Sequence, residues 1–464
     1  MQQGRCTLPV GETGRVLDRL LLLEQVIGQE GVQQALVDTQ CFDSRACRLT
    51  REVTFWVVLA MGILTELPIR QVFKAARRLR PGEKTPHRSS LCIARQRLGV
   101  APVRRLFEQT ARLLATPQTP GAFYKGWRLM ALDGSVFDVP DSAANAAAFG
   151  RPDGGRGEGA RPQIRKLSLV EAGTHAEVAL VVKGVREKNS GERSMVAGLL
   201  RHLRADMLLL WDRGFFSYSL WKSVVSQPVQ LLARVSSRLV LRSVQELCDG
   251  SYLAKIYPCE SERNKDRQGL VVRVIRYRLN DPQRVGHGIE HVLLTTLLDA
   301  VRFPALELVL LYHERWEIEL VFDEQKTHQD PCRPTKPANL RSETPLGVIQ
   351  EIYALSLGHY VTRALMAEAA ATVKLDPDRL SFLGCLHILR CRLPECAGRT
   401  PAELADWHRA LLAEMTVERT DVRRNRINPR VIKQKMSKFK KKRPEHRRLP
   451  PLLKTFIETI VIVR

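Results

Sequence analysis

The chain has 464 residues, 44% hydrophobic and 26% charged, and its 73 lysines and arginines exceed its 49 acids to give a net charge of +24. This length predicts about two to four domains with room for a sizeable core. The basic excess favours a polyanionic partner, above all nucleic acid. No membrane segment is expected, because the best apolar run, from Val53 to Leu64, is too short to span a bilayer and predicts a buried helix.

The cysteines and the N-terminus bear on the cellular compartment. Ten cysteines are scattered without a framework, which is typical of a reducing compartment. The N-terminus lacks the apolar stretch of a signal peptide. We therefore expect a cytoplasmic protein associated with the nucleoid. Two interpretations remain for Cys385, His387, Cys391 and Cys396: a structural zinc site and core residues. Zinc fingers favour other spacings, so core cysteines are the simpler interpretation.

Residues 1–118 carry long apolar stripes interrupted by polar residues, which predict a helical N-terminal domain. The second half of this domain is basic. A DNA-binding face and a solvated helical surface explain this charge equally well. The basic residues are Arg77, Arg78, Arg80, Lys84, Arg88, Arg95 and Arg97.

The pattern then changes to that of an α/β domain. Residues 119–225 and the strand VQLLARV predict three strands, a helix over 192–204, a strand, a helix and a strand. Such an order indicates a mixed sheet covered by helices. Residues 226–305 alternate apolar and polar side chains, which is typical of a β-rich insertion.

The last part of the chain returns to helical patterns. Residues 306–360 complete the α/β core and begin with a charged segment, YHERWEIELVFDEQK, at Tyr312. Residues 361–464 are expected to be a helical C-terminal region with a basic tail, in which Glu445 is the one acid between Arg423 and Arg448. Phosphate contacts from such a tail would be largely independent of DNA sequence.

The charged segment gathers four polar side chains on one side of a helix. At about 100° per residue, they fall within one narrow stripe, and the other three glutamates point elsewhere. A carboxylate between two cations could bind a divalent metal while the cations neutralise phosphate oxygens. A surface helix with salt bridges explains the same spacing, and periodicity alone favours it. The four residues are Tyr312, Arg315, Glu319 and Lys326.

Two aspartates close predicted apolar strands: Asp133 in MALDGS and Asp212 in LLLWDRGF. Carboxylates at the carboxyl ends of neighbouring strands converge where sheet proteins bind ligands, although either one alone is often a turn residue. With Glu319 they form a set of oxygen donors that suits Mg²⁺ or Mn²⁺. Three other acids are interpreted as turn or helix-end residues, and a fourth only as a weaker alternative ligand: Asp138, Asp141 and Asp206, and then Asp299.

The spacing Y-x2-R-x3-E-x6-K, after DGS and DRGF, resembles the signature of the insertion-sequence-4 family of DDE transposases. LLTTL before the signature and LRSETPLGVIQEIYAL after it are also similar to that family, so the resemblance covers most of the chain. It implies an RNase H-like mixed-sheet core with a β-rich insertion, flanked by helical N- and C-terminal domains. It also implies cut-and-paste transposition of an insertion sequence, by DNA cleavage and strand transfer through a hairpin intermediate.

The resemblance assigns roles to single residues. Asp133, Asp212 and Glu319 would be the catalytic triad and would hold Mg²⁺ or Mn²⁺, as two ions that stabilise the attacking and leaving oxygens. The DNA phosphates would be bound by Tyr312, Arg315 and Lys326. The implied partners are double-stranded DNA, as element ends and as target, and a second copy of the chain in the synaptic complex.

One feature of hairpin-forming relatives has no counterpart here. Such relatives can stack a flipped base on a tryptophan of the insertion, and none of the six tryptophans lies between residues 222 and 315. Tyr252, Tyr257 or Tyr277 could substitute. Two other functions stay open: a nuclease of the same core that only hydrolyses DNA, and an inactive DNA-binding descendant, against which the three intact acids argue.

Overall fold

The structure is a computed structural model that divides into two compact units, each assembled from separate stretches of the chain. Unit 1 comprises Met1–Ala122, Gly134–Met195 and Glu319–Thr420, and unit 2 comprises Phe123–Asp133, Val196–Ile318 and Asp421–Arg464. The boundaries of the five predicted segments stay a prediction. The residues described are 17–44, 47–77, 84–154, 157–282, 287–331, 338–397, 399–421, 431–432, 440–441 and 454–463.

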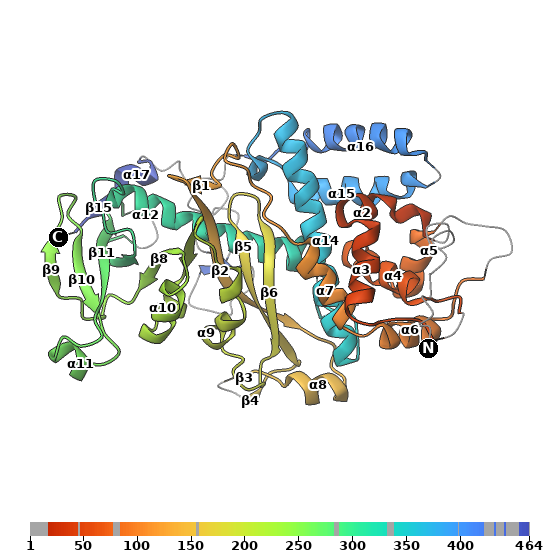
Figure 1. The fold of residues 1–464 in the computed structure, drawn as a ribbon, viewed down its shortest axis with the longest axis horizontal. Coiled ribbons are helices and arrows are strands. Elements are labelled where there is room, and N and C mark those ends of the chain that lie inside the picture. Colours follow the sequence, from red (N-terminus) through yellow and green to blue (C-terminus); the bar gives the residue numbers. More distant parts are fainter. Residues whose placement is uncertain are drawn as a thin grey trace, which may run out of the picture. The chain divides into compact units, whose positions relative to one another are not determined.

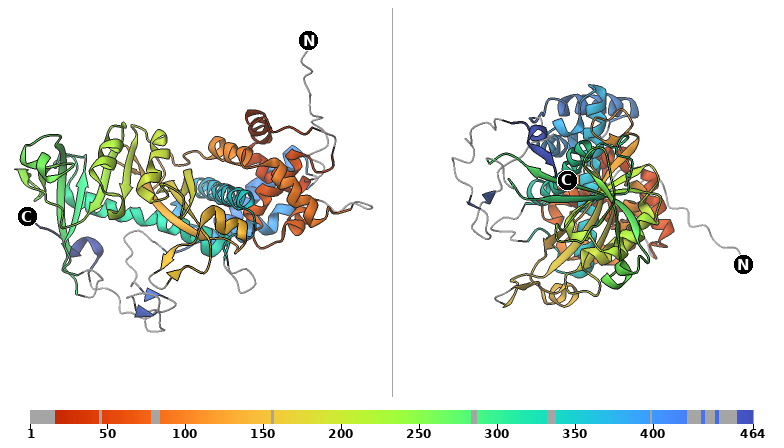
Figure 2. Two further views of the ribbon diagram at one scale, coloured as in Figure 1. Left: turned by 90° about the horizontal axis from the view of Figure 1, so that it is seen from below. Right: turned by 90° about the vertical axis from the view of Figure 1, so that its left-hand side faces the viewer.

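Unit 1 is built around α14 (Pro345–Thr372), a helix of 28 residues that is buried over most of its length. The side chain of Thr344 caps its first turn, and Pro345 occupies a position that needs no N–H donor. Because α14 is apolar on most sides, other helices enclose it, as Figure 2 shows for the red and orange N-terminal helices. The enclosing helices are α2 (Leu21–Ile27), α4 (Arg51–Ile63), α6 (Arg88–Leu98), α7 (Ala101–Thr110), α15 (Phe382–Arg392) and α16 (Pro401–Met415). Two further helices pack on these: α3 (Gln29–Asp38) on α7 and α5 (Ile69–Ala76) on α4.

Helices α4 and α14 cross with their backbones in close contact. A Cβ atom on Gly62 would lie 1.9 Å from the carbonyl oxygen of Ala354, and one on Gly358 would lie 2.7 Å from that of Gly62. The side-chain amide of Gln329 bridges the crossing, because it donates to Gly62 O at 2.7 Å and to Leu355 O at 2.9 Å. Because Gly62 and Gly358 carry no side chain, α4 packs directly against the backbone of α14.

We predict that Gly62→Ala destabilises unit 1, because the added methyl group has no space beside Ala354. Overpacking of this kind costs about 1–3 kcal/mol of unfolding free energy. Urea unfolding followed by circular dichroism measures the loss. Gly191→Ala is the control, because a Cβ atom there meets nothing within 4 Å. Equal midpoints for the two variants would contradict this account of the crossing.

The sheet follows the order β6-β5-β2-β7-β8 through its core. β5 and β6 are antiparallel, whereas β2 with β7 and β7 with β8 are parallel. This order and these directions are those of an RNase H-like sheet, so the predicted fold class is confirmed. The strands are β2 (Trp127–Asp138), β5 (Gln163–Glu171), β6 (Ala176–Gly184), β7 (Met207–Trp211) and β8 (Gln230–Val235).

In unit 2 the strands that follow β8 extend the same sheet. β12 pairs antiparallel with β8, and β11, β10 and β9 continue the antiparallel order. A strand from the end of the chain, β15, pairs with β11 (Figure 1). The strands are β1 (Phe123–Tyr124), β9 (Ser243–Glu246), β10 (Tyr252–Ile256), β11 (Leu270–Leu279), β12 (His291–Thr295) and β15 (Ile460–Ile462). The helices are α10 (Tyr218–Val225), α11 (Glu260–Asn264), α12 (Ala305–His313) and α17 (Phe456–Thr459).

Two local predictions were wrong. The helix expected over residues 192–204 is only α9 (Glu192–Met195), followed by 3-10 turns at Val196–Gly198 and Leu200–His202, since a glycine within the segment weakens an α-helix. Helix α8 (Ala143–Phe149), capped by Ser142, was missed because its alanines show no apolar period. The short strands β3 (Asp153–Gly154) and β4 (Gly157–Glu158) pair after it.

Part of the predicted basic face is structural. Arg95 is buried and donates to Gln350 Oε1 at 3.1 Å and to Gly347 O at 2.9 Å, so it ties α6 to α14. Arg77 is also buried, with its guanidinium 5.5 Å from the centre of the Phe73 ring. A DNA-binding role for these two arginines is therefore wrong. Arg78 and Arg80 lie outside the described residues.

The basic tail falls mostly outside the described residues, apart from two short parallel strands, β13 (Val431–Ile432) and β14 (Lys440–Lys441). The last described residues follow this basic run. They form α17 and then β15, which pairs with β11 in the sheet of unit 2. Across the described part of the chain, no helix combines the length and the apolar character needed to cross a membrane.

Candidate active site

Asp133 and Asp212 are neighbours across two strands of unit 2. β2 and β7 run parallel with Leu132 opposite Trp211, and the residue after each of these is an aspartate. β2 continues past Asp133 to Asp138, so the prediction that its strand ends at Asp133 was wrong, whereas Asp212 directly follows β7. Adjacent strands place the two Cα atoms about 5 Å apart. The residues before them are fully apolar and buried, as expected for parallel strands covered on both faces. The two carboxylates themselves are half-buried, and they end the apolar part of each strand.

Tyr312 lies at the end of α12 and is buried. Its hydroxyl group is 3.4 Å from Asp212 Oδ1, to which it donates a hydrogen bond. Burial raises the pKa of Tyr312 far above its usual range. The phenol therefore stays protonated at every working pH and acts as a donor that orients the Asp212 carboxylate.

Arg315 stands next to the other aspartate. Its Nη1 atom is 3.5 Å from Asp133 Oδ2, and only 6% of its side chain is exposed. The guanidinium also lies over two aromatic rings, with its carbon 6.0 Å from the Tyr312 centroid and 5.5 Å from that of Trp316. Within unit 2, each aspartate thus has one partner from the signature segment.

The signature segment is not one regular α-helix, as the sequence analysis assumed. Helix α12 is followed by a 3-10 turn, Glu314–Trp316, then by α13 (Glu317–Asp323) and by a π-helical turn, Glu324–Gln329. A 3-10 turn rotates by about 120° per residue and a π-helix by less than an α-helix. The single stripe calculated at one angle per residue is therefore wrong in detail.

Glu319 and Lys326 belong to unit 1. Glu319 is half-buried on α13. Lys326 lies on the π-helical turn, where its Nζ donates to Val136 O at 2.7 Å and lies 3.4 Å from Ser135 Oγ. Ser135 and Val136 follow Asp133 along β2 by two and three residues. The approach of Glu319 to the two aspartates, and with it the complete triad, stays a prediction.

The paired aspartates suit a hard divalent cation. They offer carboxylate oxygens from neighbouring positions on two adjacent strands, and their half-buried position leaves room for further ligands such as water or phosphate. By contrast, the four candidate zinc ligands form no such group among the described residues. Cys385 and Cys396 are buried in a helical core, whereas His387 and Cys391 are exposed.

The other acids have structural partners. Asp138 accepts from Gln163 at 2.8 Å, Asp141 pairs with Arg151, and Asp206 is 3.7 Å from Arg128. The backbone N–H groups of Val301 and Arg302 both donate to Asp299 at 2.9 Å. The contacts of Asp299 are those of a cap residue. Asp138 is the last residue of β2, so its interpretation as a turn residue was wrong.

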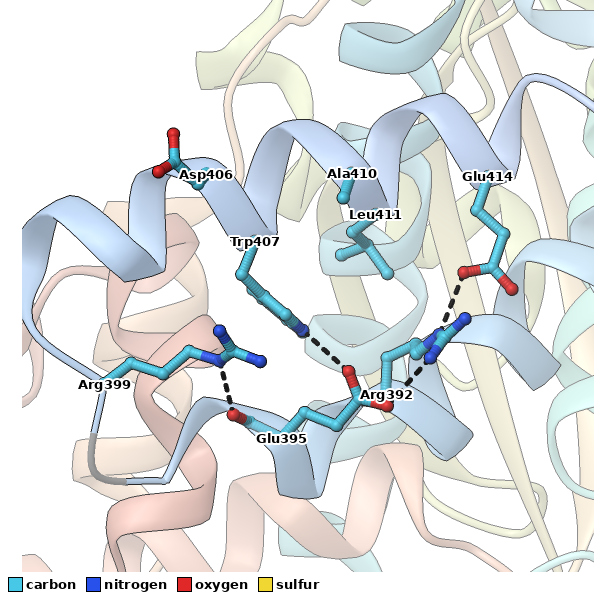
Figure 3. Close-up of a pocket in the computed structure, with 8 residues that line it drawn as sticks. All are labelled: Arg392, Glu395, Arg399, Asp406, Trp407, Ala410, Leu411 and Glu414. Carbon is cyan, nitrogen blue, oxygen red and sulfur yellow. Dashed lines mark hydrogen bonds and ion pairs between the residues drawn. The ribbon is translucent and has the colours of Figure 1, made fainter.

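A pocket of about 370 Å³ lies between α15 and α16 in unit 1 (Figure 3). Arg392 lies between two acids, 2.9 Å from both Glu395 and Glu414, and Trp407 donates to Glu395 at 3.1 Å. None of the predicted site residues lines it. The pocket is therefore not part of the candidate active site.

Sequence reasoning missed the polar residues beneath the signature segment. Glu324, Gln325 and Gln329 are all buried, although the first was interpreted only as pointing away from the stripe. The available signal was the occurrence of polar residues at positions where a regular helix would place apolar ones. No periodicity rule identifies their partners, which come from distant strands and helices.

His313 predicts a pH dependence of stability. It is partly buried, and its ring packs against the Phe456 ring, with centroids 4.2 Å apart. Burial, reinforced by the charge of nearby His291, lowers its pKa from 6.5 to about 3. Below about pH 6.5 only the unfolded chain binds this proton, so the stability present above that pH is lost progressively toward pH 3, by up to about 5 kcal/mol.

The measurement is the urea midpoint between pH 8 and pH 4 for the wild type and His313→Gln. We expect the variant to have the flatter profile over this range. His387→Gln serves as the control, because His387 is exposed. A wild-type slope that His313→Gln leaves unchanged would show that another group titrates.

An RNase H-like sheet with aspartates at neighbouring positions of two adjacent strands, followed by a signature segment that carries a glutamate, defines the class of DDE transposases. Two family models match the chain: "Insertion element 4 transposase N-terminal" over residues 17–108 and "Transposase DDE domain" over residues 125–343. The chain belongs to the insertion-sequence-4 family of DDE transposases.

Similar proteins cover much of the chain. Transposase InsG for insertion sequence element IS4, from Escherichia coli (strain K12), is 29% identical over 425 residues, which are 90% of this chain and 93% of the relative. Putative transposase InsZ from the same organism is 24% identical over 49% of this chain and 80% of its own length. A cryo-EM structure of a piggyBac transposase synaptic complex with hairpin DNA shares 12% identity at a TM-score of 0.43, over 86% of each chain.

Proposed function

We propose that this transposase cuts DNA at the ends of its own element and joins the freed ends to target DNA, with a divalent metal at Asp133, Asp212 and Glu319. The observation that carries the proposal is the strand register that makes Asp133 and Asp212 neighbours. Membership of the family supports the glutamate as the third ligand. The net charge of +24 suits a DNA partner.

The proposed site would hold two Mg²⁺ or Mn²⁺ ions. When bound, they would lower the charge on the attacking and leaving oxygens of an in-line displacement at phosphorus. The triad carboxylates supply hard oxygen ligands. Tyr312 keeps the Asp212 carboxylate in one orientation by donating to it.

The proposed phosphate grip consists of Tyr312, Arg315 and Lys326, and Tyr312 also donates to Asp212. The Arg315 guanidinium lies 3.5 Å from Asp133, so a phosphate bound beside Asp133 comes within its reach. A guanidinium can donate two parallel hydrogen bonds to one phosphate, whereas Lys326 acts as a point charge. The buried ring of Tyr312 lies beside the Arg315 guanidinium and holds it in place before DNA arrives.

One chemical step, repeated, serves the whole proposed reaction. In the first displacement a water oxygen forms a bond to phosphorus and the 3′ oxygen leaves, which produces a nick. The 3′ hydroxyl then attacks the opposite strand and forms a hairpin. A second water opens the hairpin, and the 3′ hydroxyl finally attacks the target. Because each step exchanges one oxygen for another at phosphorus, a single site suffices.

The proposal includes a homodimer. Both ends of an element must be held together before joining, and each end needs its own active site, so two copies of the chain would form the synaptic complex. The C-terminal helices α15 and α16 are the expected contact surface, and sedimentation with and without end DNA would test the stoichiometry.

We expect Glu319→Gln to reduce both strand cleavage and strand transfer by at least about 100-fold, because loss of one ligand charge weakens metal-dependent catalysis by several kcal/mol. The assay uses the element's own ends with Mn²⁺. End binding in a gel-shift assay should stay close to that of the wild type.

Asp206→Asn is the matched control, since this acid is partly exposed and contacts arginines. A Glu319→Gln protein that still cleaves would refute the triad. Cleaved DNA without joined products from the wild-type protein would instead indicate a nuclease.

The proposed hairpin step needs an aromatic face for a flipped base. Tyr252 and Tyr277 of the insertion are buried, and the Tyr257 hydroxyl is held by Asp266 at 2.6 Å. Trp316 is 39% exposed and is adjacent in sequence to Arg315. We therefore include Trp316 as the stacking residue in place of a tryptophan in the insertion.

Trp316→Ala should lower hairpin formation by roughly 10-fold while first-strand nicking is unchanged, because stacking of one base contributes about 1–3 kcal/mol. Denaturing gels that resolve nicked, hairpin and linear products measure both steps. Trp316→Phe keeps an aromatic face and should retain most of the activity. Equal loss of nicking and hairpin formation in Trp316→Ala would contradict the stacking role.

A further inference from the structure

The π-helical turn Glu324–Gln329 is held from one side by three buried polar side chains. At about 82° per residue, Glu324 and Gln329 are about 50° apart around a π-helix, whereas an α-helix would separate them by about 140°. The π geometry therefore lets both face the interior of unit 1. Lys326 is about 160° from Glu324 around the turn, and its Nζ lies 5.3 Å from the centre of the Phe137 ring.

The first anchor is Glu324. His359 Nε2 lies 2.8 Å from Glu324 Oε2, and Arg363 Nε donates to the same oxygen at 3.0 Å. His175, in the turn between β5 and β6, lies 3.2 Å from Glu324 Oε1. Although burial alone would raise it, the Arg363 guanidinium beside the carboxyl group holds the pKa of Glu324 well below its usual range. The anchor is a charged group bound to α14 and the β-hairpin.

The second anchor is Gln325. Lys166 Nζ on β5 donates to its Oε1 atom at 2.5 Å, and its Nε2 atom donates to Glu177 Oε2 on β6 at 3.0 Å. Lys166 and Glu177 are themselves paired at 2.8 Å and fully buried. Gln325 thus extends an existing ion pair and adds two hydrogen bonds of fixed direction.

The third anchor is Gln329, which bridges α4 and α14 at their glycine crossing. Lys326 lies between the second and third anchors in the sequence and donates to Val136 O at 2.7 Å. Buried ionic groups are often replaceable by apolar ones with little loss of stability. We therefore take the contribution of the three anchors to be the orientation of the π-helical turn and not its stability.

We infer that Glu324, Gln325 and Gln329 are positioning residues that set the direction of Lys326 toward a DNA phosphate. The inference rests on the proposed function, because it takes the phosphate contact of Lys326 as given. It adds that the contact depends on the three buried anchors of the π-helical turn, which never touch DNA.

The test is a double-mutant cycle between Gln325 and Lys326. Gln325→Met keeps the length of the side chain and leaves Lys166 paired with Glu177, so the fold should be retained. We expect Gln325→Met and Lys326→Ala each to lower strand transfer by about 10-fold. In the Lys326→Ala background, Gln325→Met should change the strand-transfer rate by less than 2-fold. A residue that acts through Lys326 has no further effect once the lysine side chain is removed.

Ser168→Ala is the matched control. Its hydroxyl group donates to the same Glu177 carboxylate but lies on β5, away from the turn. It should leave strand transfer close to wild type. The inference is overturned if Gln325→Met retains wild-type transfer, if its effect multiplies with that of Lys326→Ala, or if Ser168→Ala causes the same loss.

A binding measurement separates this inference from the proposed function. The slope of log K against log salt concentration for end DNA should fall by about one in both Gln325→Met and Lys326→Ala, since each loses one phosphate contact. If the wild type neither cleaves nor transfers, the proposed function fails and this slope still decides the inference. If Gln325→Met does not fold by circular dichroism, Gln329→Met replaces it with the same expected results.

Discussion

The parallel pairing of β2 with β7 is the constraint on which the rest of the site depends. Because Leu132 lies opposite Trp211, the two apolar strands end at the same level and both continue with an aspartate. A shift of one residue in either strand would turn one carboxylate to the other face of the sheet. Burial of both apolar runs fixes the register. The same apolar packing therefore stabilises the core of unit 2 and determines where the two proposed metal ligands lie.

The interior of unit 1 combines this kind of apolar packing with charge. A carboxylate, two histidines and an arginine meet beneath the signature segment, and a lysine–glutamate pair lies next to the same turn. Such groups are costly to bury and contribute little net stability. They restrict which arrangements of α14, the β-hairpin and the π-helical turn satisfy every donor and acceptor. These buried polar groups therefore select one geometry for the interior of unit 1 and add little to its free energy of unfolding.

The sequence predicted the parts of the structure that follow from local patterns. The apolar runs before Asp133 and Asp212 predicted strands, and these strands exist in an RNase H-like order. The spacing of Tyr, Arg, Glu and Lys in the signature segment, after the two aspartates, identified the family. Sequence reasoning did not predict the burial of Arg95, because its partners Gln350 and Gly347 are more than 250 residues away. It also assumed one regular helix from Tyr312 to Lys326, since a periodicity of 3.6 residues cannot detect a 3-10 or a π turn.

The irregular helix has a consequence for the meaning of a sequence motif. The seven steps from Glu319 to Lys326 would complete nearly two α-helical turns, yet here they include the start of a π-helical turn that changes the phase by tens of degrees. The number of residues between two signature positions therefore encodes an angle as well as a distance. An engineer who idealised this segment into a straight α-helix would keep every signature residue and lose the relative direction in which they point.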